Sequence, residues 1–241
     1  MDILLINPNT TASMTDKIGA AARLVAGAGV KVTALNPAMG PASIEGHYDG
    51  ALAVPGLLQV LRDNPADACI IACFDDTGLA AARCASAAPV IGIGEAAFHL
   101  ASLIATRFSV VTTLSRAIPV IEANLRDYGL ATRCARVRAS DVPVLELEIP
   151  GSTARERISA EIERALAEDG AEAIVLGCAG MADLAAELSQ RHGVPVVDGV
   201  ASAVQLAQSL ARLGLRTSKR GGYAAPLAKP YLGPLADLAP R

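Results

Sequence analysis

Ile70-Ile71-Ala72-Cys73-Phe74-Asp75-Asp76-Thr77-Gly78-Leu79 begins as an apolar run, turns at polar residues and continues into a helical segment. The same plan recurs 105 positions later, in Val175-Leu176-Gly177-Cys178-Ala179-Gly180-Met181-Ala182-Asp183. In each copy a cysteine follows a strand and precedes a helix, and Asp76 or Thr77 is the expected N-cap of the first helix. The repeat predicts two equivalent strand ends, each of which carries a thiol.

The rest of the chain also lines up at this shift. Ile6 falls opposite Val111, and Asp67 falls opposite Glu172. Such self-similarity favours a duplicated α/β unit, although any two β-α-β segments share some resemblance. Apolar runs that alternate with helical segments are typical of a parallel sheet. We predict an α/β fold of two pseudo-symmetric domains, each a mostly parallel four-stranded sheet flanked by helices, with the active site in the cleft between them.

The pattern predicts strands that alternate with helices along the whole chain. The expected strands are 3–7, 30–35, 68–74, 90–93, 108–113, 131–138, 173–178 and 194–198. The expected helices are 13–26, 50–62, 79–86, 96–106, 115–128, 153–168, 181–191 and 200–213. We assign residues 1–97 and 199–241 to the first domain and 98–198 to the second, because the last helix has no following strand. Glycines and prolines after Arg216 predict an irregular tail that either wraps a neighbouring molecule or is loose.

Composition and charge exclude several classes of protein. The 241 residues are 52% hydrophobic, which is ample for buried cores, and the net charge of -3 leaves no basic surface for a nucleic acid. The first residues carry an acid where a signal peptide needs positive charge, and no stretch approaches the ~20 apolar residues of a membrane span. We expect a cytoplasmic protein without nucleic-acid or membrane partners.

The five cysteines, at positions 69, 73, 84, 134 and 178, show no paired Cys-x-x-Cys spacing. Their odd number argues against a disulfide framework, and their spacing argues against a zinc site. The three histidines also lack metal-ligand spacing, and Gly92-Ile93-Gly94 lacks the spacing of a dinucleotide loop. We therefore expect reduced thiols and no metal or cofactor.

Cys73 and Cys178 are the candidates for catalysis. A thiol next to a helix N-terminus is expected to have a pKa below the usual ~8.5, although Asp75 and Asp76 act in the opposite direction at Cys73. A free cysteine usually packs as a small hydrophobic residue, which is our interpretation of the other three. Two thiols at matching points of a repeat favour a catalytic pair over coincidence.

A symmetric pair of thiols suits the inversion of a stereocentre, which needs a base on one face and an acid on the other. The carbanion would become enolate-like, held by backbone N–H groups after each cysteine. Polar loops at 7–11 and 112–115 are expected at the same edge of the sheets, where they either bind substrate or only cap helices. For Glu45, His47 and Asp49 the alternatives are a position facing the cleft and a solvated loop, and we favour the solvated loop.

With Asn7-Pro8-Asn9-Thr10, Cys73-Phe74-Asp75-Asp76 and Gly177-Cys178-Ala179-Gly180-Met181, the chain resembles the aspartate/glutamate/hydantoin racemase superfamily, and within it the hydantoin racemases. The resemblance implies a cofactor-free reaction, a homo-oligomer and Cys73 and Cys178 as the catalytic pair. The amino-acid racemases of this superfamily have a carboxylate and a histidine where this chain has Asn7 or Asn9 and Ala179. This departure favours a neutral cyclic ureide over glutamate or aspartate.

Racemisation of 5-monosubstituted hydantoins is therefore the expected function. The expected substrate-binding residues are Asn9, Phe74, Asp75, Thr112, Thr113, Ala179 and Gly180. Allantoin is the closest alternative substrate, because it shares the ring and differs only at the 5-substituent. A decarboxylase or cis-trans isomerase of the same superfold is less favoured, and so is a non-enzymatic binding module with two α/β lobes, which would not explain the paired thiols.

Overall fold

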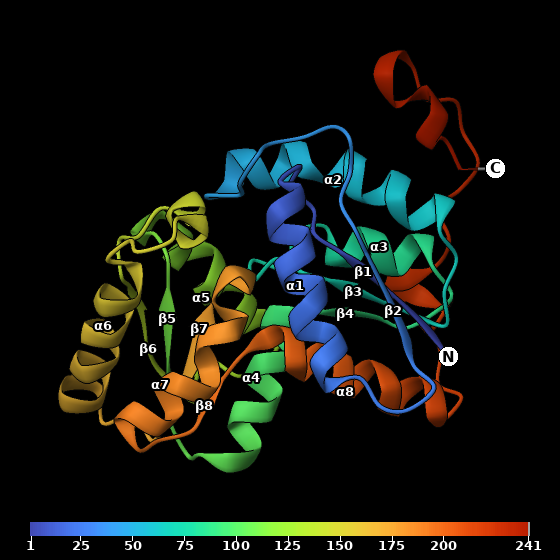
Figure 1. Cartoon of the computed structure of the whole chain (residues 1–241). Coiled ribbons are helices and arrows are strands. Elements are labelled where there is room, and N and C mark those ends of the chain that lie inside the picture. The colour runs from blue at the N-terminus through green and yellow to red at the C-terminus, as the bar shows by residue number, and fades with distance from the viewer. Residues whose placement is uncertain (241) are drawn as a thin grey trace.

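The computed structural model describes residues 1–240 and contains two four-stranded sheets (Figure 1). The strands are β1 (Asp2–Ile6), β2 (Lys31–Leu35), β3 (Ala68–Ile71), β4 (Val90–Gly92), β5 (Phe108–Thr112), β6 (Cys134–Ala139), β7 (Ala173–Gly177) and β8 (Val196–Val197). The first sheet has the order β2-β1-β3-β4 and the second the order β6-β5-β7-β8, and every neighbouring pair is parallel. The identical orders confirm the predicted α/β fold of two pseudo-symmetric units.

Helices flank both sheets at the places that the sequence predicts. They are α1 (Ala12–Val25), α2 (His47–Asp63), α3 (Leu79–Ala85), α4 (Ile93–Ile104), α5 (Ile118–Asp127), α6 (Ala154–Asp169), α7 (Ala185–His192) and α8 (Gly199–Arg212). Among residues 1–240, no helix has both the length and the apolar character that crossing a membrane requires.

Several element ends differ from the prediction. β3 ends at Ile71 instead of residue 74, because the backbone turns once Ala72 N–H has bonded the Ile6 carbonyl. α7 begins at Ala185 instead of residue 181, because a 3₁₀ helix, η3 (Ala179–Leu184), fills the intervening turn. β6 begins at Cys134 instead of residue 131, because the N–H groups of residues 133 and 134 bond the Leu130 carbonyl in a turn. Each shift lies at a strand or helix end, where turn hydrogen bonds outweigh apolar periodicity.

The largest group of buried apolar residues runs without a break from one sheet to the other through α4 and α8. Phe98 of α4 makes an edge-to-face contact with Phe74 at 5.3 Å between ring centroids and stacks on Phe108 of β5 at 6.1 Å. α8 follows the second sheet in the sequence but packs against α1, α4 and β3. The expected boundary at residue 97 lies inside α4, and the division into 1–97 with 199–241 and 98–198 stays a prediction.

The start of the C-terminal tail is attached to its own chain. Thr217 bonds the carbonyls of residues 87 and 88, and Lys219 Nζ donates to the Arg83 and Cys84 carbonyls. The Tyr223 ring lies 5.5 Å from the Arg83 guanidinium carbon. The expectation of a loose tail is therefore wrong for residues 217–223, because these polar contacts fix that segment against α3 and the loop after it. The alternative that the tail wraps a neighbouring molecule stays a prediction. Beyond it the chain is mostly exposed and extends away from both sheets (Figure 1).

Candidate active site

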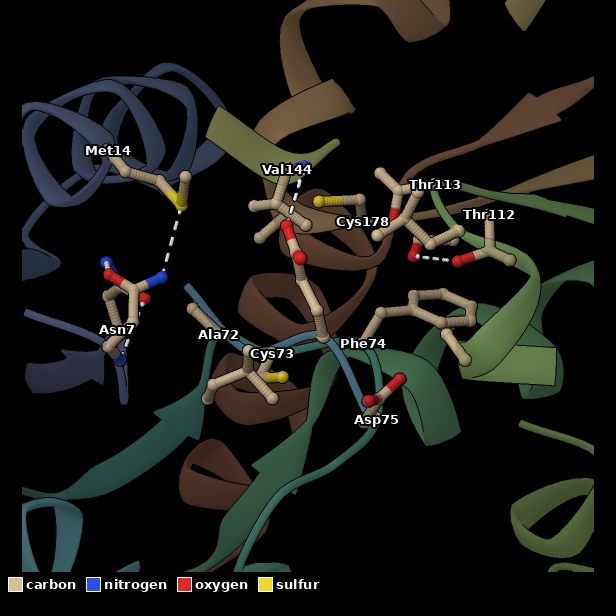
Figure 2. Close-up of a pocket in the computed structure, with 17 residues that line it drawn as sticks. Asn7, Met14, Ala72, Cys73, Phe74, Asp75, Thr112, Thr113, Val144 and Cys178 are labelled. Carbon is tan, nitrogen blue, oxygen red and sulfur yellow. Dashed lines mark hydrogen bonds between the residues drawn. The ribbon is translucent and has the colours of Figure 1, made fainter. Parts of the chain in front are cut away.

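Cys73 and Cys178 lie at the carboxyl ends of equivalent strands. Cys73 is two residues past β3, and Cys178 directly follows β7, the strands that hold the same position in their sheets. Both sulfurs face one pocket (Figure 2). The pocket is lined by Asn7, Asn9, Met14, Ile44, Glu45, Ala72, Cys73, Phe74, Asp75, Thr112, Thr113, Leu114, Ala117, Val144, Gly177, Cys178 and Ala179. The topology thus places the two thiols in a common space.

Most of the residues singled out in the sequence come together here. Asn9, Phe74, Asp75, Thr112, Thr113 and Ala179 all line the pocket. Gly180 does not, but its N–H faces the Cys178 sulfur. Phe74 is almost fully buried against Phe98, so it belongs to the core as well as to the pocket wall. The other three cysteines lie outside the pocket.

Some lining residues were not foreseen. Val144 belongs to a short 3₁₀ helix, η2 (Val144–Glu148), and its N–H donates to Glu45 Oε1 across the pocket at 3.1 Å. The solvated loop expected at Glu45 is therefore wrong for this residue, because its carboxylate closes against the other half of the molecule. His47 is exposed as expected, and Asp49 accepts the Glu45 N–H at 3.0 Å. A lone acid in a polar loop gives no sequence signal for such a contact.

Asp76 holds the Cys73 loop in place. Sequence reasoning made Asp76 or Thr77 the N-cap of α3, but Gly78 holds that position. The backbone of Asp76 is in the left-handed region, at φ 50°, which turns its carboxylate toward the N-terminus of α4. There it accepts the Gly94 and Glu95 N–H groups at 3.0 and 2.8 Å, as an N-cap does. These hydrogen bonds attach the loop after β3 to the N-terminus of α4.

The second half of the molecule also holds this loop. The Tyr128 hydroxyl donates to Asp76 Oδ2 at 2.8 Å, and Asn124 Nδ2 donates to the Asp75 carbonyl at 2.9 Å. Burial raises the pKa of the Asp76 carboxyl to about 7, although its hydrogen bonds favour the charged form. The position of the Cys73 thiol therefore depends on contacts from both halves.

The two glycines of Gly92-Ile93-Gly94 make room for this anchor. A Cβ at Gly92 would lie 2.1 Å from Asp76 Oδ1, and one at Gly94 would lie 2.4 Å from the Phe74 carbonyl oxygen. Such distances are shorter than side chains tolerate. The motif that resembles a fragment of a dinucleotide loop is therefore needed for the packing of the Cys73 loop.

Both thiols have raised pKa values, whereas the sequence predicts a lowered pKa at Cys178 and leaves the direction at Cys73 open. Burial raises the pKa of Cys178 to about 11 and that of Cys73 well above its ordinary value. The N–H of Gly180 and the cation of Lys17 favour the Cys178 thiolate, but they do not offset burial. Cys73 does not directly precede its helix, because α3 begins only at Leu79. Removal from water outweighs the local dipoles at both sulfurs.

Asp75 carries a carboxyl that acts on both thiols. Its negative charge raises the pKa of Cys73 and of Cys178, so it faces both sulfurs. Burial raises the pKa of Asp75 itself to about 6. Figure 2 shows its carboxyl at the pocket beside the Cys73 loop. The pocket therefore holds a titratable acid next to two titratable thiols.

The first polar loop is held together by its own amides. Asn7 Nδ2 donates to Asn9 Oδ1 at 2.8 Å and to Thr15 Oγ1 at 3.0 Å. Asn9 Oδ1 also accepts the Thr11 N–H at 2.9 Å. In the second half, Thr112 Oγ1 donates to the Gly177 carbonyl at 3.0 Å (Figure 2). Both loops line the pocket, and neither α1 nor the 3₁₀ turn at 115–117 has a side-chain hydrogen bond from its N-cap residue. Substrate binding by these loops stays a prediction.

The sequence profile named Asp/Glu/hydantoin racemase matches residues 3–207. The chain belongs to the Asp/Glu/hydantoin racemase family. It is 52% identical to a hydantoin racemase of Rhizobium meliloti over 97% of this chain and 98% of that protein. The structure of allantoin racemase from Klebsiella pneumoniae superposes with a TM-score of 0.97 at 47% identity, and covers 100% of both chains. That of allantoin racemase from Pseudomonas fluorescens gives a TM-score of 0.93 at 46% identity, over 97% of this chain and 100% of that chain.

Membership of the racemase family makes this chain an isomerase and sets aside the alternative of a non-enzymatic binding module. Within residues 1–240, no three His, Cys, Asp or Glu side chains gather as a metal site. A reaction without metal or cofactor stays a prediction.

The charged side chains that line the pocket are acidic. Asp75 and Glu45 line it, and no lysine, arginine or histidine is among its lining residues in the described part of the chain. An amino-acid substrate would bring one or two carboxylates to a wall that offers acids and no cation. A substrate carboxylate and the carboxylates of the pocket would repel one another, and the repulsion is strong where water is excluded. A neutral molecule meets no such penalty.

Proposed function

We propose that this chain racemises 5-monosubstituted hydantoins by moving the C5 proton between Cys73 and Cys178. The observation that carries the proposal is the single pocket that both thiols line, at equivalent ends of two identically ordered sheets. Proton removal from one face of a carbon and return on the other needs one base and one acid on opposite sides. Two thiols, one ionised and one neutral, meet that need and exchange roles for the other enantiomer.

The proton balance is complete without a co-reactant. For one enantiomer, the Cys178 thiolate takes the C5 proton, so the C5–H bond breaks, an S–H bond forms and the electron pair moves into the adjacent ring carbonyl. The Cys73 thiol then gives its proton to the opposite face of C5, and the thiolate charge ends on Cys73. The other enantiomer reacts in the reverse order. Each passage inverts C5 and leaves the proton on Cys178 and the negative charge on Cys73. Proton exchange with water, or reaction of the other enantiomer, restores the starting state.

The charges around the two thiols favour this assignment for the free enzyme. Burial and the negative charge of Asp75 raise the pKa of both thiols. The Gly180 N–H and Lys17 oppose this at Cys178, and the rise is smaller there than at Cys73, where the Thr77 hydroxyl is the main opposing contact. Cys178 therefore ionises more readily, and the Cys73 thiol keeps its proton. The enzyme would begin most turnovers with its base on the second half of the molecule.

Allantoin is a second candidate substrate, because the two solved structures described above are named allantoin racemases. Allantoin is itself a hydantoin with a ureido group at C5, so the same proton transfer applies. The lining residues Ile44, Leu114, Ala117 and Val144 are apolar and favour an alkyl or aryl substituent. Polarimetry on several 5-alkyl and 5-arylalkyl hydantoins, allantoin, glutamate and aspartate separates these candidates by kcat/KM.

The two-thiol reaction is tested by replacing each sulfur in turn. Cys73→Ser and Cys178→Ser should each abolish racemisation, with loss of at least about 10³-fold in kcat/KM, because one face loses its acid or base. Each variant should still exchange the C5 proton of one enantiomer with deuterated solvent, and the two variants should prefer opposite enantiomers. Polarimetry measures the first effect, and NMR of the C5 proton measures the second.

Cys84→Ser is the matched control, since this cysteine lies outside the pocket next to the Gly222 carbonyl. It should keep activity near that of the unmodified enzyme. If Cys73→Ser or Cys178→Ser racemised within tenfold of the control, the two-thiol mechanism would be wrong. If no hydantoin or allantoin were racemised by the unmodified enzyme, the substrate class itself would be wrong.

A further inference from the structure

Asn9 offers the pocket a hydrogen-bond donor whose orientation is fixed. Its Oδ1 accepts two donors, the Thr11 backbone N–H at 2.9 Å and Asn7 Nδ2 at 2.8 Å. A backbone N–H can only donate, so this oxygen cannot be exchanged with the amide nitrogen by a flip of the side chain. The Asn9 NH₂ group must therefore point the other way.

The partner of that NH₂ group is weak. Asn9 Nδ2 reaches the Met14 sulfur at 3.3 Å, and Figure 2 draws the contact at Met14 as a dashed line. A thioether sulfur is a poor hydrogen-bond acceptor. This contact therefore offsets only a small part of the free energy that the amide loses when its hydrogen bonds to water are removed. Asn9 is 5% exposed and lines the pocket. A buried donor beside the thiols thus lacks a strong acceptor until a ligand supplies one.

The backbone N–H groups after the two cysteines also act on the sulfurs. The Asp75 N–H faces the Cys73 sulfur, and the Gly180 N–H faces the Cys178 sulfur, where they stabilise thiolate. Backbone N–H groups after each cysteine are predicted to hold the enolate, and these two also favour the charged form of the sulfurs. The oxygen that becomes negative during proton transfer needs a donor of its own.

We propose that the Asn9 side-chain amide donates to the ring carbonyl next to C5 and stabilises the enolate oxygen during proton transfer. This inference rests on the proposed racemisation of a hydantoin ring. The parallel register places Asn9 for this role, because Ile6 of β1 pairs with Ile71 of β3 and the loops after these strands leave the sheet side by side. A donor fixed in advance toward developing charge lowers the barrier more than it strengthens substrate binding.

Asn9→Asp is the decisive substitution, because it keeps Oδ1 for Thr11 and Asn7 and replaces only the NH₂ group. We expect kcat/KM for 5-benzylhydantoin to fall by about 100- to 1000-fold, as for the loss of one oxyanion donor. 5,5-Dimethylhydantoin has no C5 proton and therefore reports ground-state binding. Its Kd, measured by calorimetry, should rise by less than about tenfold, since most of the loss belongs to the transition state.

Asn36→Asp is the matched control. The substitution again replaces an amide by a carboxylate. Asn36 belongs to the same hydrogen-bond network, since its Oδ1 accepts the Thr15 hydroxyl at 2.9 Å, but Asn36 does not line the pocket. We expect its kcat/KM to stay within threefold of the unmodified enzyme. Circular dichroism and thermal unfolding establish that both variants are folded.

The outcomes separate this inference from the function on which it rests. If the unmodified enzyme racemises hydantoins and Asn9→Asp does so within threefold, the Asn9 role is wrong and the function stands. A rise in Kd equal to the fall in kcat/KM also overturns it, because Asn9 would then only bind the ring. If Asn9→Asp does not fold, NMR of the unmodified enzyme decides: the Asn9 side-chain amide protons should shift downfield with saturating 5,5-dimethylhydantoin, and unchanged shifts would contradict the proposal.

Discussion

Burial lowers the fraction of each thiol that is ionised and makes each thiolate a stronger base. The raised pKa values of the thiols leave little thiolate at neutral pH, and the same burial makes each thiolate a stronger base once it forms. A weakly acidic C–H needs a strong base, so a desolvated sulfur suits it better than a solvated one. A helix N-terminus acting alone would have produced more thiolate and a poorer base. Catalysis at this pocket should therefore increase with pH through the neutral range.

The charge of Asp75 determines the pH range over which kcat/KM increases. Burial raises its pKa to about 6, so it is neutral below that pH and negative above it. Its negative charge raises the pKa of both thiols. Asp75→Asn removes the charge, so the thiol pKa values should fall and the ascending limb of kcat/KM should move to lower pH. The shift should appear only above pH 6, because below it the unmodified side chain is also neutral.

The measurement is the full pH profile of kcat/KM, with thiolate absorbance at 240 nm as a second observable. Asp16→Asn is the control, since this acid is exposed on α1 and faces neither sulfur. It should leave the profile in place. The carboxyl does not act on the thiols if the ascending limb of kcat/KM for Asp75→Asn coincides with that of the unmodified enzyme. The same conclusion follows if the limb moves to higher pH.

At the scale of secondary structure, the strand ends could be predicted and the loop anchors could not. Apolar runs that end in cysteine placed both thiols, because the carboxyl ends of parallel strands share one edge. The anchor at Asp76 escaped prediction because its partners Gly94 and Tyr128 lie 18 and 52 residues away. Val144 escaped it because a short 3₁₀ helix carries no periodic signal. Local patterns specify elements, whereas distant contacts complete the pocket.

Gly94 tests whether α4 controls the Cys73 loop. A Cβ on Gly94→Ala would approach the Phe74 carbonyl to 2.4 Å, so either the loop or the helix must move. We expect a loss of about 1–3 kcal/mol in the free energy of unfolding, the usual range for overpacking, measured by urea titration. Because Phe74 adjoins Cys73, kcat/KM should also fall by more than about tenfold, as misplacement of a catalytic group predicts.

Gly50→Ala is the matched control on α2, where the added methyl would lie 3.7 Å from the Thr77 side chain. That is an ordinary contact, and alanine suits a helix interior better than glycine. Its stability should be unchanged or slightly increased. Equal behaviour of the two alanine variants would mean that the tight approach at Gly94 does not position the loop.

At the scale of the whole molecule, the two halves are joined too firmly to act as separate lobes. The buried apolar group that crosses from β3 through α4 and α8 to β7 would have to be broken for one half to rotate away from the other. Interiors packed in this way resist such motion. The contact over the pocket is weaker, since Glu45 Oε1 and the Val144 N–H are joined by one hydrogen bond. We infer that substrate enters by separation of these two segments.

Glu45→Ala tests whether the hydrogen bond between these two segments holds the pocket closed. Without the hydrogen bond to Val144 the closed pocket loses about 1.4 kcal/mol, so the dissociation rate of 5,5-dimethylhydantoin should rise about tenfold. Glu45→Gln keeps an acceptor for the Val144 N–H, and its rate should stay within about threefold of the unmodified enzyme. Stopped-flow displacement measures all three rates. An unchanged rate for Glu45→Ala would place the slow step elsewhere, because this hydrogen bond would then not hold the pocket closed.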